Sequence, residues 1–325
     1  MKEIFDFVLK YRLDVRLYFL YGFFFSSFFT PLAIYIGKRF GIIDKPRGKE
    51  ERKKINMVPI PRSGGIAIYC SLVVLFLIIG NFSRQFIGII IGATIIFVGM
   101  LIDDKRGLSV AQKFTLQFAA AFVAIFTGTK FIAVSNPFGE GMIQLGFLGT
   151  IFTVLWIVGV TNAINIIDGL DGLASGVATI SSVFIAIIAM YKGNTSLAFL
   201  LLGLSGVLIA FLIYNFYPAR IILGDSGAEI LGFMLATISV AGAYKTATLI
   251  SIVFPLLTLG IPITEVFTSI IRRLRSGTSP FKYDTDHIHY ILLKKGWSQR
   301  RIASFYYFVT VMLSFVGVLL AFGFK

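Results

Sequence analysis

Four polar side chains recur at intervals of three residues in one short stretch of the sequence. They follow an apolar run, 147–160, that is long enough to cross most of a bilayer, and they are Asn162, Asn165, Asp168 and Asp171. On a continuous helix such positions form a slowly drifting stripe whose neighbours can share one ligand. A carboxylate at membrane depth costs roughly 2.5–3.5 kcal/mol, so two of them favour a cation or phosphate site over a helix end lying in water.

A second pair of acids, Asp103 and Asp104, directly follows another apolar run. Adjacent carboxylates repel each other, which is useful where a cation or a transferable proton offsets the charge. The alternative is a structural pair that Lys105 and Arg106 neutralise at the membrane boundary. The presence of two separate acid pairs in one chain favours the functional interpretation.

Asp225 is flanked by glycine at the start of a further apolar run. A carboxylate at a helix start can bind Mg²⁺, and the exposed backbone N–H groups there favour a phosphate. Ser226 and Glu229 fit a capping box, a structural role that does not account for Asp225. We therefore take Asp225 as the leading metal ligand.

The only two histidines of the chain, His287 and His289, lie in a basic segment. Residues two positions apart diverge on a helix, so we expect a loop that points both rings inward. Zinc is disfavoured because no thiolate joins them, whereas hard carboxylates with phosphate favour Mg²⁺. The same segment contains the motif SPF at 279–281 and two further acids at 284 and 286.

Three arginines precede the histidines, at Arg272, Arg273 and Arg275. Such residues serve either as positive-inside anchors of a span or as phosphate ligands. Glu265, inside the apolar run that precedes these arginines, is expected to pair with Arg272 or Arg273 in a structural role.

The stretch 59–65, at the start of the apolar run 64–80, supplies rigid prolines, the cation of Arg62 and a glycine pair that allows close approach.

The elements that must position these residues are membrane spans. The 325 residues are 57% hydrophobic, with a mean hydropathy of +0.86. This composition predicts an all-α polytopic integral membrane protein forming one domain, 1–325. Although the formal charge is +14, the basic residues lie between spans, which disfavours nucleic acid as a partner. The single cysteine, Cys70, excludes an intrachain disulfide.

Ten spans are predicted from the recurring apolar runs. They cover about 17–37, 64–80, 86–102, 111–128, 147–164, 173–191, 197–216, 227–243, 248–271 and 303–323.

Five connections, with Lys113 at the edge of its span, carry most of the 30 Lys and Arg residues, and the positive-inside rule places them in the cytoplasm. They are 38–63, 103–110, 165–172, 217–226 and 272–302. Both termini then face outward, as an even number of spans requires. The acids and histidines described above fall on the same connections, so we expect one cytoplasmic active face.

Five motifs together resemble the polyprenyl-phosphate N-acetylhexosamine-1-phosphate transferases of glycosyltransferase family 4. They are PIPRSGGIA at 59–67, LIDDKRGLS at 101–109, NAINIIDGLDGLA at 162–174, ILGDSG at 222–227 and RRLRSGTSPF with DHIH at 272–289. The resemblance runs in order from about residue 38 to 302 and is closest to the N-acetylglucosamine-1-phosphate branch. One departure is Tyr290, which stands where that branch often has another histidine.

The resemblance implies ten transmembrane helices in the cytoplasmic membrane and often a homodimer. It also implies transfer of N-acetylglucosamine-1-phosphate, or a close relative, from a UDP-sugar to undecaprenyl phosphate, with release of UMP, at the start of a lipid-linked cell-envelope glycan. Mg²⁺, with Mn²⁺ as a substitute, is the implied cofactor, bound by Asp225 with Asp168 and Asp171.

The remaining roles are also carried over by resemblance. Asp103 and Asp104, with Asp168, are candidates for activating the lipid phosphate or steadying the metal, and an electrostatic role is favoured over proton abstraction because a phosphate monoester is already largely dianionic. Arg273, His287 and His289 are expected to hold phosphates and the sugar. The expected substrate-binding residues are Arg62, Asn165, Gly169, Leu170, Asp171 and Arg275.

Three alternatives stay open at this point. A phospho-N-acetylmuramoyl-pentapeptide transferase shares the same general chemistry. An intramembrane prenyltransferase could hold a prenyl diphosphate with paired aspartates, but it would not need the histidine segment. A secondary transporter could place acids on an ion path, but those acids would lie at the midplane within internal repeats.

Overall fold

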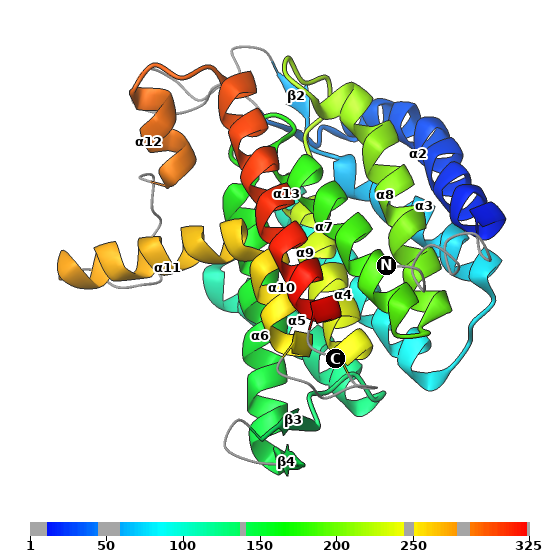
Figure 1. Ribbon diagram of the computed structural model, residues 1–325. Helices are drawn as coiled ribbons and strands as arrows, with labels where there is room; N and C mark the ends of the chain where they lie inside the picture. The colour runs from blue at the N-terminus through cyan, green and yellow to red at the C-terminus, as the bar shows by residue number, and fades with distance from the viewer. Residues whose placement is uncertain (1–11, 45–58, 137–140, 244–249, 278–286, 324–325) are drawn as a thin grey trace.

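The computed structural model describes residues 12–44, 59–136, 141–243, 250–277 and 287–323, and these parts of the chain are almost entirely helical (Figure 1). The helices are α2 (Arg12–Phe40), α3 (Gly64–Ile79), α4 (Arg84–Arg106), α5 (Val110–Phe126), α6 (Gly146–Ile167), α7 (Leu173–Tyr191), α8 (Thr195–Asn215), α9 (Gly224–Ala243), α10 (Ile250–Thr258), α11 (Gly260–Arg275), α12 (Ile288–Lys294) and α13 (Gln299–Gly323). Two small antiparallel hairpins pair β1 (Ile43–Asp44) with β2 (Ile60–Pro61), and β3 (Ala133–Ser135) with β4 (Met142–Gln144).

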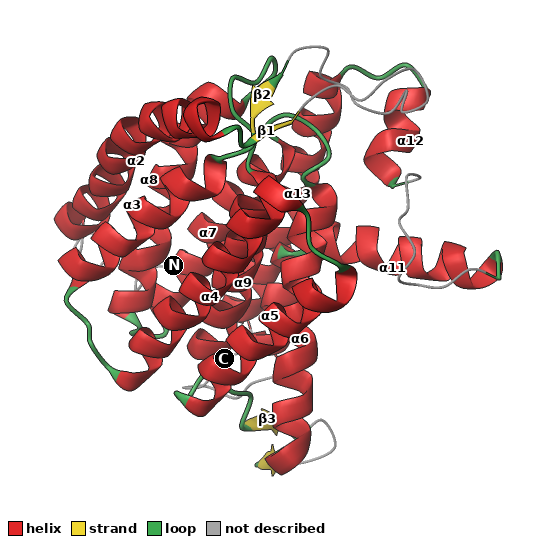
Figure 2. Cartoon of the chain, turned by 180° about the vertical axis from the view of Figure 1, so that it is seen from behind, coloured by secondary structure: helices red, strands yellow, loops and turns green. Residues whose placement is uncertain are grey.

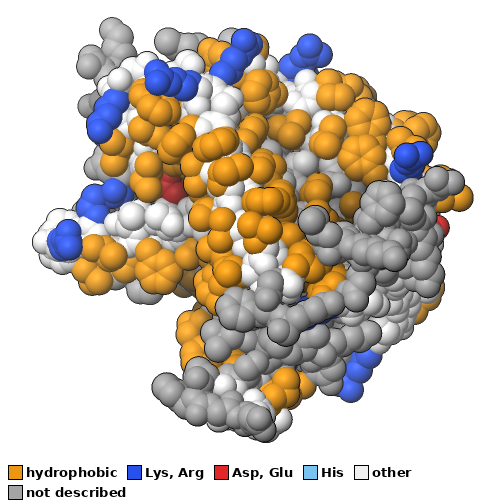
Figure 3. Space-filling view, viewed as in Figure 1, with side chains coloured by type: hydrophobic (Ala, Val, Ile, Leu, Met, Phe, Trp, Pro, Cys, Tyr) orange, Lys and Arg blue, Asp and Glu red, His pale blue; other side chains and the backbone are white. Residues whose placement is uncertain are grey.

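Six of the described helices, α2, α4, α6, α7, α8 and α13, are long and apolar enough to cross a membrane, and α3 and α5 are shorter apolar helices. Large apolar side chains stand on the outside of the bundle, among them Phe24, Phe147 and Phe308. Figure 3 shows hydrophobic side chains spread over the flank of the molecule. An outer surface of this kind suits lipid tails, which are as apolar as these side chains. The predicted all-α polytopic membrane fold is confirmed.

Helix α9 lies at the centre of the bundle, with helices on every side (Figure 2). Every residue from Ser226 to Ala241 is buried, as expected for a helix that is covered on all faces. Small residues let its neighbours come close: a Cβ at Gly232 would lie 2.6 Å from the Cα of Thr161 on α6. The first residue of α9, Gly224, lies next to the end of α4, because a Cβ there would be 2.8 Å from the carboxylate oxygens of Asp104.

The prediction of one continuous span over 248–271 is wrong. Within the described part of this segment the helix breaks at Leu259, so α10 and α11 are separate helices. The ring of a proline clashes with the carbonyl of the residue four positions earlier. For Pro262 that residue is Thr258, the last of α10, and Pro262 itself sits in the first turn of α11, where its missing N–H does no harm. Helix α11 then leaves the side of the bundle (Figures 1 and 2).

The polar stripe of the sequence is divided between a helix and a turn. Helix α6 ends at Ile167, so Asn162 and Asn165 lie on the helix, whereas Asp168 and Asp171 lie in the turn before α7. The turn closes at Gly172, whose φ of 74° is the left-handed conformation that glycine adopts readily. We call residues 168–172 the α6–α7 turn.

Candidate active site

A set of backbone hydrogen bonds between three segments of the chain positions Arg62 in the site. The N–H of Arg62 extends the β1–β2 pairing by donating to the carbonyl of Ile42 at 2.9 Å. On the other side of this strand, the N–H of Ile222 donates to the carbonyl of Pro61 at 3.0 Å, and Gly64 N–H donates back to the Ile222 carbonyl at 3.1 Å. Backbone hydrogen bonds thereby join the stretch that contains Arg62 to the loop before α9, and they place Arg62 at the start of that helix.

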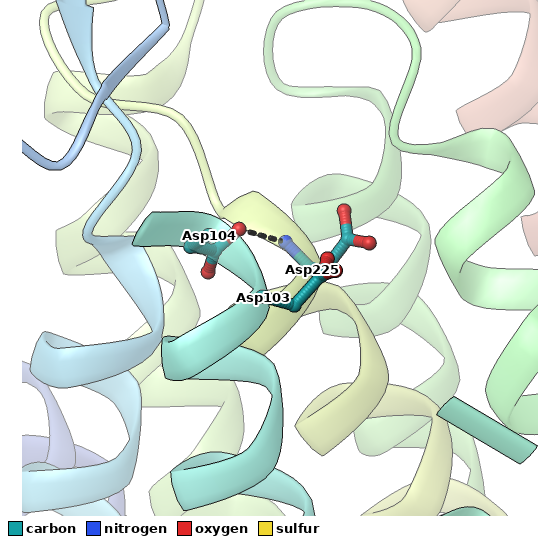
Figure 4. A group of neighbouring side chains, drawn as sticks. All are labelled: Asp103, Asp104 and Asp225. Atoms are coloured by element: carbon teal, nitrogen blue, oxygen red, sulfur yellow. Dashed lines mark hydrogen bonds between the residues drawn. The ribbon is translucent and has the colours of Figure 1, made fainter. Parts of the chain in front are cut away.

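Asp104 connects three parts of the site. Its Oδ1 accepts from Arg62 Nε at 2.7 Å and from the backbone N–H of Asp225 at 2.8 Å, the contact drawn as a dashed line in Figure 4. Its Oδ2 accepts from the N–H of Ser226 at 3.0 Å, and the side chain is fully buried. Asp104 therefore caps the first turn of α9 from another helix and places a negative charge at the positive end of that helix.

Asp103 pairs with Lys113, whereas Asp104 pairs with Arg62. Its Oδ2 accepts from Lys113 Nζ at 2.6 Å, and its Oδ1 accepts from the N–H of Leu108 at 2.6 Å. The ammonium of Lys113 also pairs with Asp225, which in turn pairs with the guanidinium of Arg62. Three carboxylates and two cations are thus interleaved where α4, α5 and α9 meet. We call this group, Arg62, Asp103, Asp104, Lys113 and Asp225, the charge cluster.

The structural alternative for the acid pair of α4 is not observed. Lys105 and Arg106 are exposed, and the cations that contact Asp103 and Asp104 come from other elements. Because side chains at adjacent helical positions point in different directions, a neighbour in sequence is poorly placed to neutralise a buried acid.

The capping-box interpretation of Ser226 and Glu229 is wrong. Helix α9 begins at Gly224, so Ser226 lies inside its first turn, and no described residue hydrogen-bonds its buried Oγ. Glu229 points into the bundle, where its Oε2 accepts from Gln117 Nε2 at 2.9 Å. The cap is supplied by Asp104, from a position that no local pattern in the α9 sequence could reveal.

Asp103, Asp104 and Asp225 each offer one carboxylate oxygen, and these oxygens lie within 4.8 Å of one another (Figure 4). Hard oxygen donors at this spacing fit Mg²⁺ better than a softer metal. Of the sequence-predicted metal ligands, the structure therefore brings Asp225 together with Asp103 and Asp104. The metal roles of Asp168 and Asp171 stay predictions.

The acids of the α6–α7 turn differ in their surroundings. Asp171 is buried, and its Oδ2 accepts from the N–H of Ala219 at 3.0 Å, which ties this turn to the segment before α9. Asp168 is half-buried, and its carboxylate is close enough to the charge cluster to interact with Arg62, Asp104 and Asp225. Burial raises the pKa of Asp168 well above its usual range; Arg62 opposes this shift, whereas the neighbouring carboxylates add to it. A cation beside Asp168 would favour its ionised form.

The other substrate-binding candidates of this region, Asn165 at the end of α6 and two residues of the turn, differ in their surroundings. Asn165 is half-buried, and its Nδ2 lies 3.4 Å from Oε1 of Glu229. Gly169 packs against the histidine segment, because a Cβ there would lie 2.5 Å from His289 Nε2. Leu170 is buried at 4% exposure, so its side chain packs in the core.

Both histidines are buried, with ring centroids 5.6 Å apart and ring planes nearly parallel. His287 directly precedes α12 and His289 lies in its first turn, and this placement on either side of a helix start lets both rings point the same way. The inward orientation expected from the sequence is confirmed, but the expected loop is wrong for His289, which lies on α12. The pairing expected for Glu265 is wrong: its Oε1 accepts from Tyr306 Oη at 2.5 Å and lies 3.1 Å from His289 Nδ1.

Arg273 and Arg275 are on the last turn of α11, where Arg273 is half-buried and Arg275 is exposed. This end of α11 points away from the bundle in Figure 1. The SPF motif at 279–281 and the acids at 284 and 286 lie outside the described residues. Within the described residues, the structure therefore does not bring Arg273 or Arg275 into the charge cluster (Figure 1), and their catalytic and substrate-binding roles stay predictions.

Sequence reasoning used Lys113 only to count charge and gave Gln117 no role. Lys113 is nevertheless the only charged residue between 107 and 129, and a lone charge in an apolar span is a functional-site signal by default. Gln117 lies one turn further along α5 and links Asn162 to Glu229, with Asn162 Nδ2 donating to Gln117 Oε1 at 2.7 Å. No sequence signal pointed to Gln117.

The chain matches the sequence model of a known protein family. The model of glycosyl transferase family 4 matches residues 86–243, which contain four of the five cluster residues, all but Arg62. A "probable undecaprenyl-phosphate N-acetylglucosaminyl 1-phosphate transferase" of Bacillus subtilis is 37% identical over 90% of this chain and 80% of its own length.

Two more distant relatives cover similar shares. The "undecaprenyl-phosphate alpha-N-acetylglucosaminyl 1-phosphate transferase" of Escherichia coli K12 is 27% identical over 91% of this chain and 81% of its own. The "decaprenyl-phosphate N-acetylglucosaminephosphotransferase" of Mycobacterium leprae is 30% identical over 89% of this chain and 79% of its own. The similarity therefore extends well beyond the span of the family model.

Proposed function

Because this chain belongs to glycosyl transferase family 4, among the polyprenyl-phosphate N-acetylglucosamine-1-phosphate transferases, we propose that it transfers N-acetylglucosamine-1-phosphate from a UDP-sugar to undecaprenyl phosphate and releases UMP. The acceptor and the transferred group follow the names of the relatives. The UDP-sugar donor follows from the chemistry, since a sugar-1-phosphate must arrive with a leaving group attached to its phosphorus.

The observation that carries the proposal is the charge cluster. The reaction brings two anions together, the lipid phosphate and the donor diphosphate, so cations must neutralise them during attack. Arg62 and Lys113 supply two cations on opposite sides of Asp225. The site also lies at helix ends, where a lipid headgroup from the bilayer could meet a nucleotide sugar from the cytoplasm.

Mg²⁺ fits the same residues, and Asp225, with Asp103 and Asp104, would hold it. When bound, the ion would supply positive charge to the diphosphate oxygens and polarise the phosphorus that is attacked. The surplus of acids over cations in the cluster, three against two, leaves one negative charge for such an ion to balance.

In the proposed reaction an oxygen of the lipid phosphate forms a bond to the phosphorus that bears the sugar. The bond from that phosphorus to the oxygen of UMP breaks, and UMP leaves with the electron pair. No proton needs to be removed from a dianionic phosphate, so Asp103 acts by holding Lys113 and not as a base. Asp104 keeps Arg62 and the start of α9 in place for attack in line.

Purified protein in detergent tests the proposal directly. UMP should appear from UDP-N-acetylglucosamine only when a polyprenyl phosphate is present, and a polyprenyl-diphosphate-sugar should form in equal amount. UDP-N-acetylgalactosamine and UDP-N-acetylmuramoyl-pentapeptide serve as competing donors. Exclusive use of the pentapeptide donor would show that the transferred sugar is not N-acetylglucosamine. UMP release without a polyprenyl phosphate would contradict transfer to a lipid.

A further inference from the structure

Glu265 is the one strongly buried acid of α11, and it joins three elements of the structure. Its Oε1 accepts from Tyr306 on α13 at 2.5 Å and meets the Nδ1 of His289 on α12 at 3.1 Å. Its Oε2 accepts from the backbone N–H of Ile288 at 2.9 Å. The proposed reaction gives this residue no role, although a carboxylate with this many contacts is firmly fixed in position.

The contact with Glu265 decides which ring nitrogen of His289 carries hydrogen. A carboxylate can only accept, so Nδ1 must be the protonated nitrogen that donates to it. The other nitrogen, Nε2, is buried and has no hydrogen-bond partner among the described residues. A buried polar atom without a partner is costly, and such an atom in a native site calls for an explanation.

The unpartnered Nε2 is directed at the α6–α7 turn. A Cβ on Gly169 would lie 2.5 Å from it, so Gly169 packs closely against Nε2, and a larger residue there would displace the ring. Tyr290 Oη donates to the carbonyl of Gly169 at 3.4 Å and holds the turn beside the ring. The adjacent residue in the chain is Asp168, whose carboxylate interacts electrostatically with Arg62 and Asp225.

We infer that Glu265 is a positioning residue that fixes His289 with Nδ1–H toward itself and Nε2 toward the α6–α7 turn, ready for an oxygen of the donor substrate. This inference rests on the proposed function for the nature of the substrate. The carboxylate acts through the ring: it sets the tautomer and the orientation, and it stabilises positive charge on the imidazole when Nε2 donates a hydrogen bond.

Spectroscopy of the intact protein tests the first half of this inference. The chain has only two histidines, so ¹⁵N labelling of histidine gives two imidazoles, and a His287→Gln variant assigns them. Wild type should show His289 with Nδ1 protonated and hydrogen-bonded. Glu265→Leu, whose side chain offers no acceptor to Nδ1, should lose that signature and show a mixture of tautomers. An unchanged His289 spectrum in Glu265→Leu would overturn the inference.

Kinetics test the second half. Glu265→Gln should lower kcat roughly 10- to 100-fold, by analogy with the loss of a carboxylate that orients a metal-bound histidine, while KM for the donor changes little. Glu265→Asp keeps the charge and should recover part of the loss. Tyr306→Phe is the matched control, because it removes another contact of the same carboxylate oxygen and should keep the His289 signature and most of the activity.

The outcomes separate the two proposals. If Tyr306→Phe and Glu265→Gln lose activity equally with the same fall in thermal stability, Glu265 only ties α11 to α13, and the inference fails. If wild type shows no transfer, the proposed function fails, but the spectra still decide whether Glu265 fixes His289.

Discussion

The ammonium of Lys113 lies 2.6 Å from Oδ2 of Asp103, and the same ammonium pairs with Asp225 across the junction of two helices. One flexible lysine thus bridges two acids that the proposed reaction requires. An ammonium in this place can neutralise the acids in the absence of substrate and remain close enough to meet a phosphate. Substitution of this lysine is therefore a sharp test of the charge cluster.

Lys113→Met should lower kcat/KM by roughly 100-fold or more, because Asp103 and Asp225 lose their shared cation and the lipid phosphate meets an uncompensated pair of acids. The measurement is formation of polyprenyl-diphosphate-sugar over a series of Mg²⁺ concentrations. Lys105→Met is the control, because Lys105 is exposed and should tolerate the change. Equal activity of both variants would remove Lys113 from the mechanism.

Asp225→Asn should keep the fold while Mg²⁺-dependent turnover falls by several orders of magnitude, because the side chain keeps its shape but loses its charge. Raising the donor concentration should not restore turnover. EDTA provides the zero point of the titration. Near-normal turnover with an unchanged Mg²⁺ dependence would place the cation elsewhere, among Asp103, Asp104 and Asp168.

Gly65→Ala should reduce both thermal stability and activity, because a Cβ there would lie 2.7 Å from the backbone nitrogen of Gly227 and would push α3 away from α9. Arg62 would then lose its position beside Asp225. Gly159→Ala is the matched control, since a Cβ at that position would meet no atom within 4 Å and alanine favours a helix. The melting temperature and the transfer activity are measured for both variants, and equal values for the two would contradict this prediction.

Arg273→Ala should weaken catalysis far more than membrane insertion, because a guanidinium near the histidine segment can grip a phosphate with two hydrogen bonds. Arg106→Ala, which removes an exposed arginine of α4, provides the comparison. Expression level in the membrane fraction and specific activity are measured for both. Activity of Arg273→Ala within about twofold of wild type would leave Arg273 as a topological anchor.

The charge cluster should face the cytoplasm, as the concentration of Lys and Arg on its side of the chain predicts. Cysteines at Lys49, outside the described residues, and at Lys294 should resist an impermeant thiol reagent in intact cells, whereas a cysteine at Lys130 should react. The background carries Cys70→Ala, which removes the only native thiol. Ready labelling at Lys49 and Lys294 would overturn this orientation and the shared active face.

The amino-acid sequence by itself determined the membrane class, because apolar runs of bilayer length have few other uses and each can be recognised locally. It also brought Asp103, Asp104, Asp168 and Asp225 to attention, because acids beside such runs are costly and therefore rarely incidental. The sequence did not determine the break between α10 and α11, because Pro255 lies inside α10 without ending it, whereas the helix does end four positions before Pro262.

Only the tertiary structure decided which charges meet. Arg62 and Asp225 are 163 positions apart, and their pairing depends on the backbone hydrogen bonds that join two loops. Local reasoning offered Lys105 and Arg106 as the structural alternative for the α4 acid pair and Arg272 or Arg273 as the partner of Glu265. The observed partners are Lys113 for Asp103 and His289 for Glu265. The physical reason is that a side chain's partner is set by the direction in which its helix face points and by the elements packed against that face, and spacing along the chain specifies neither.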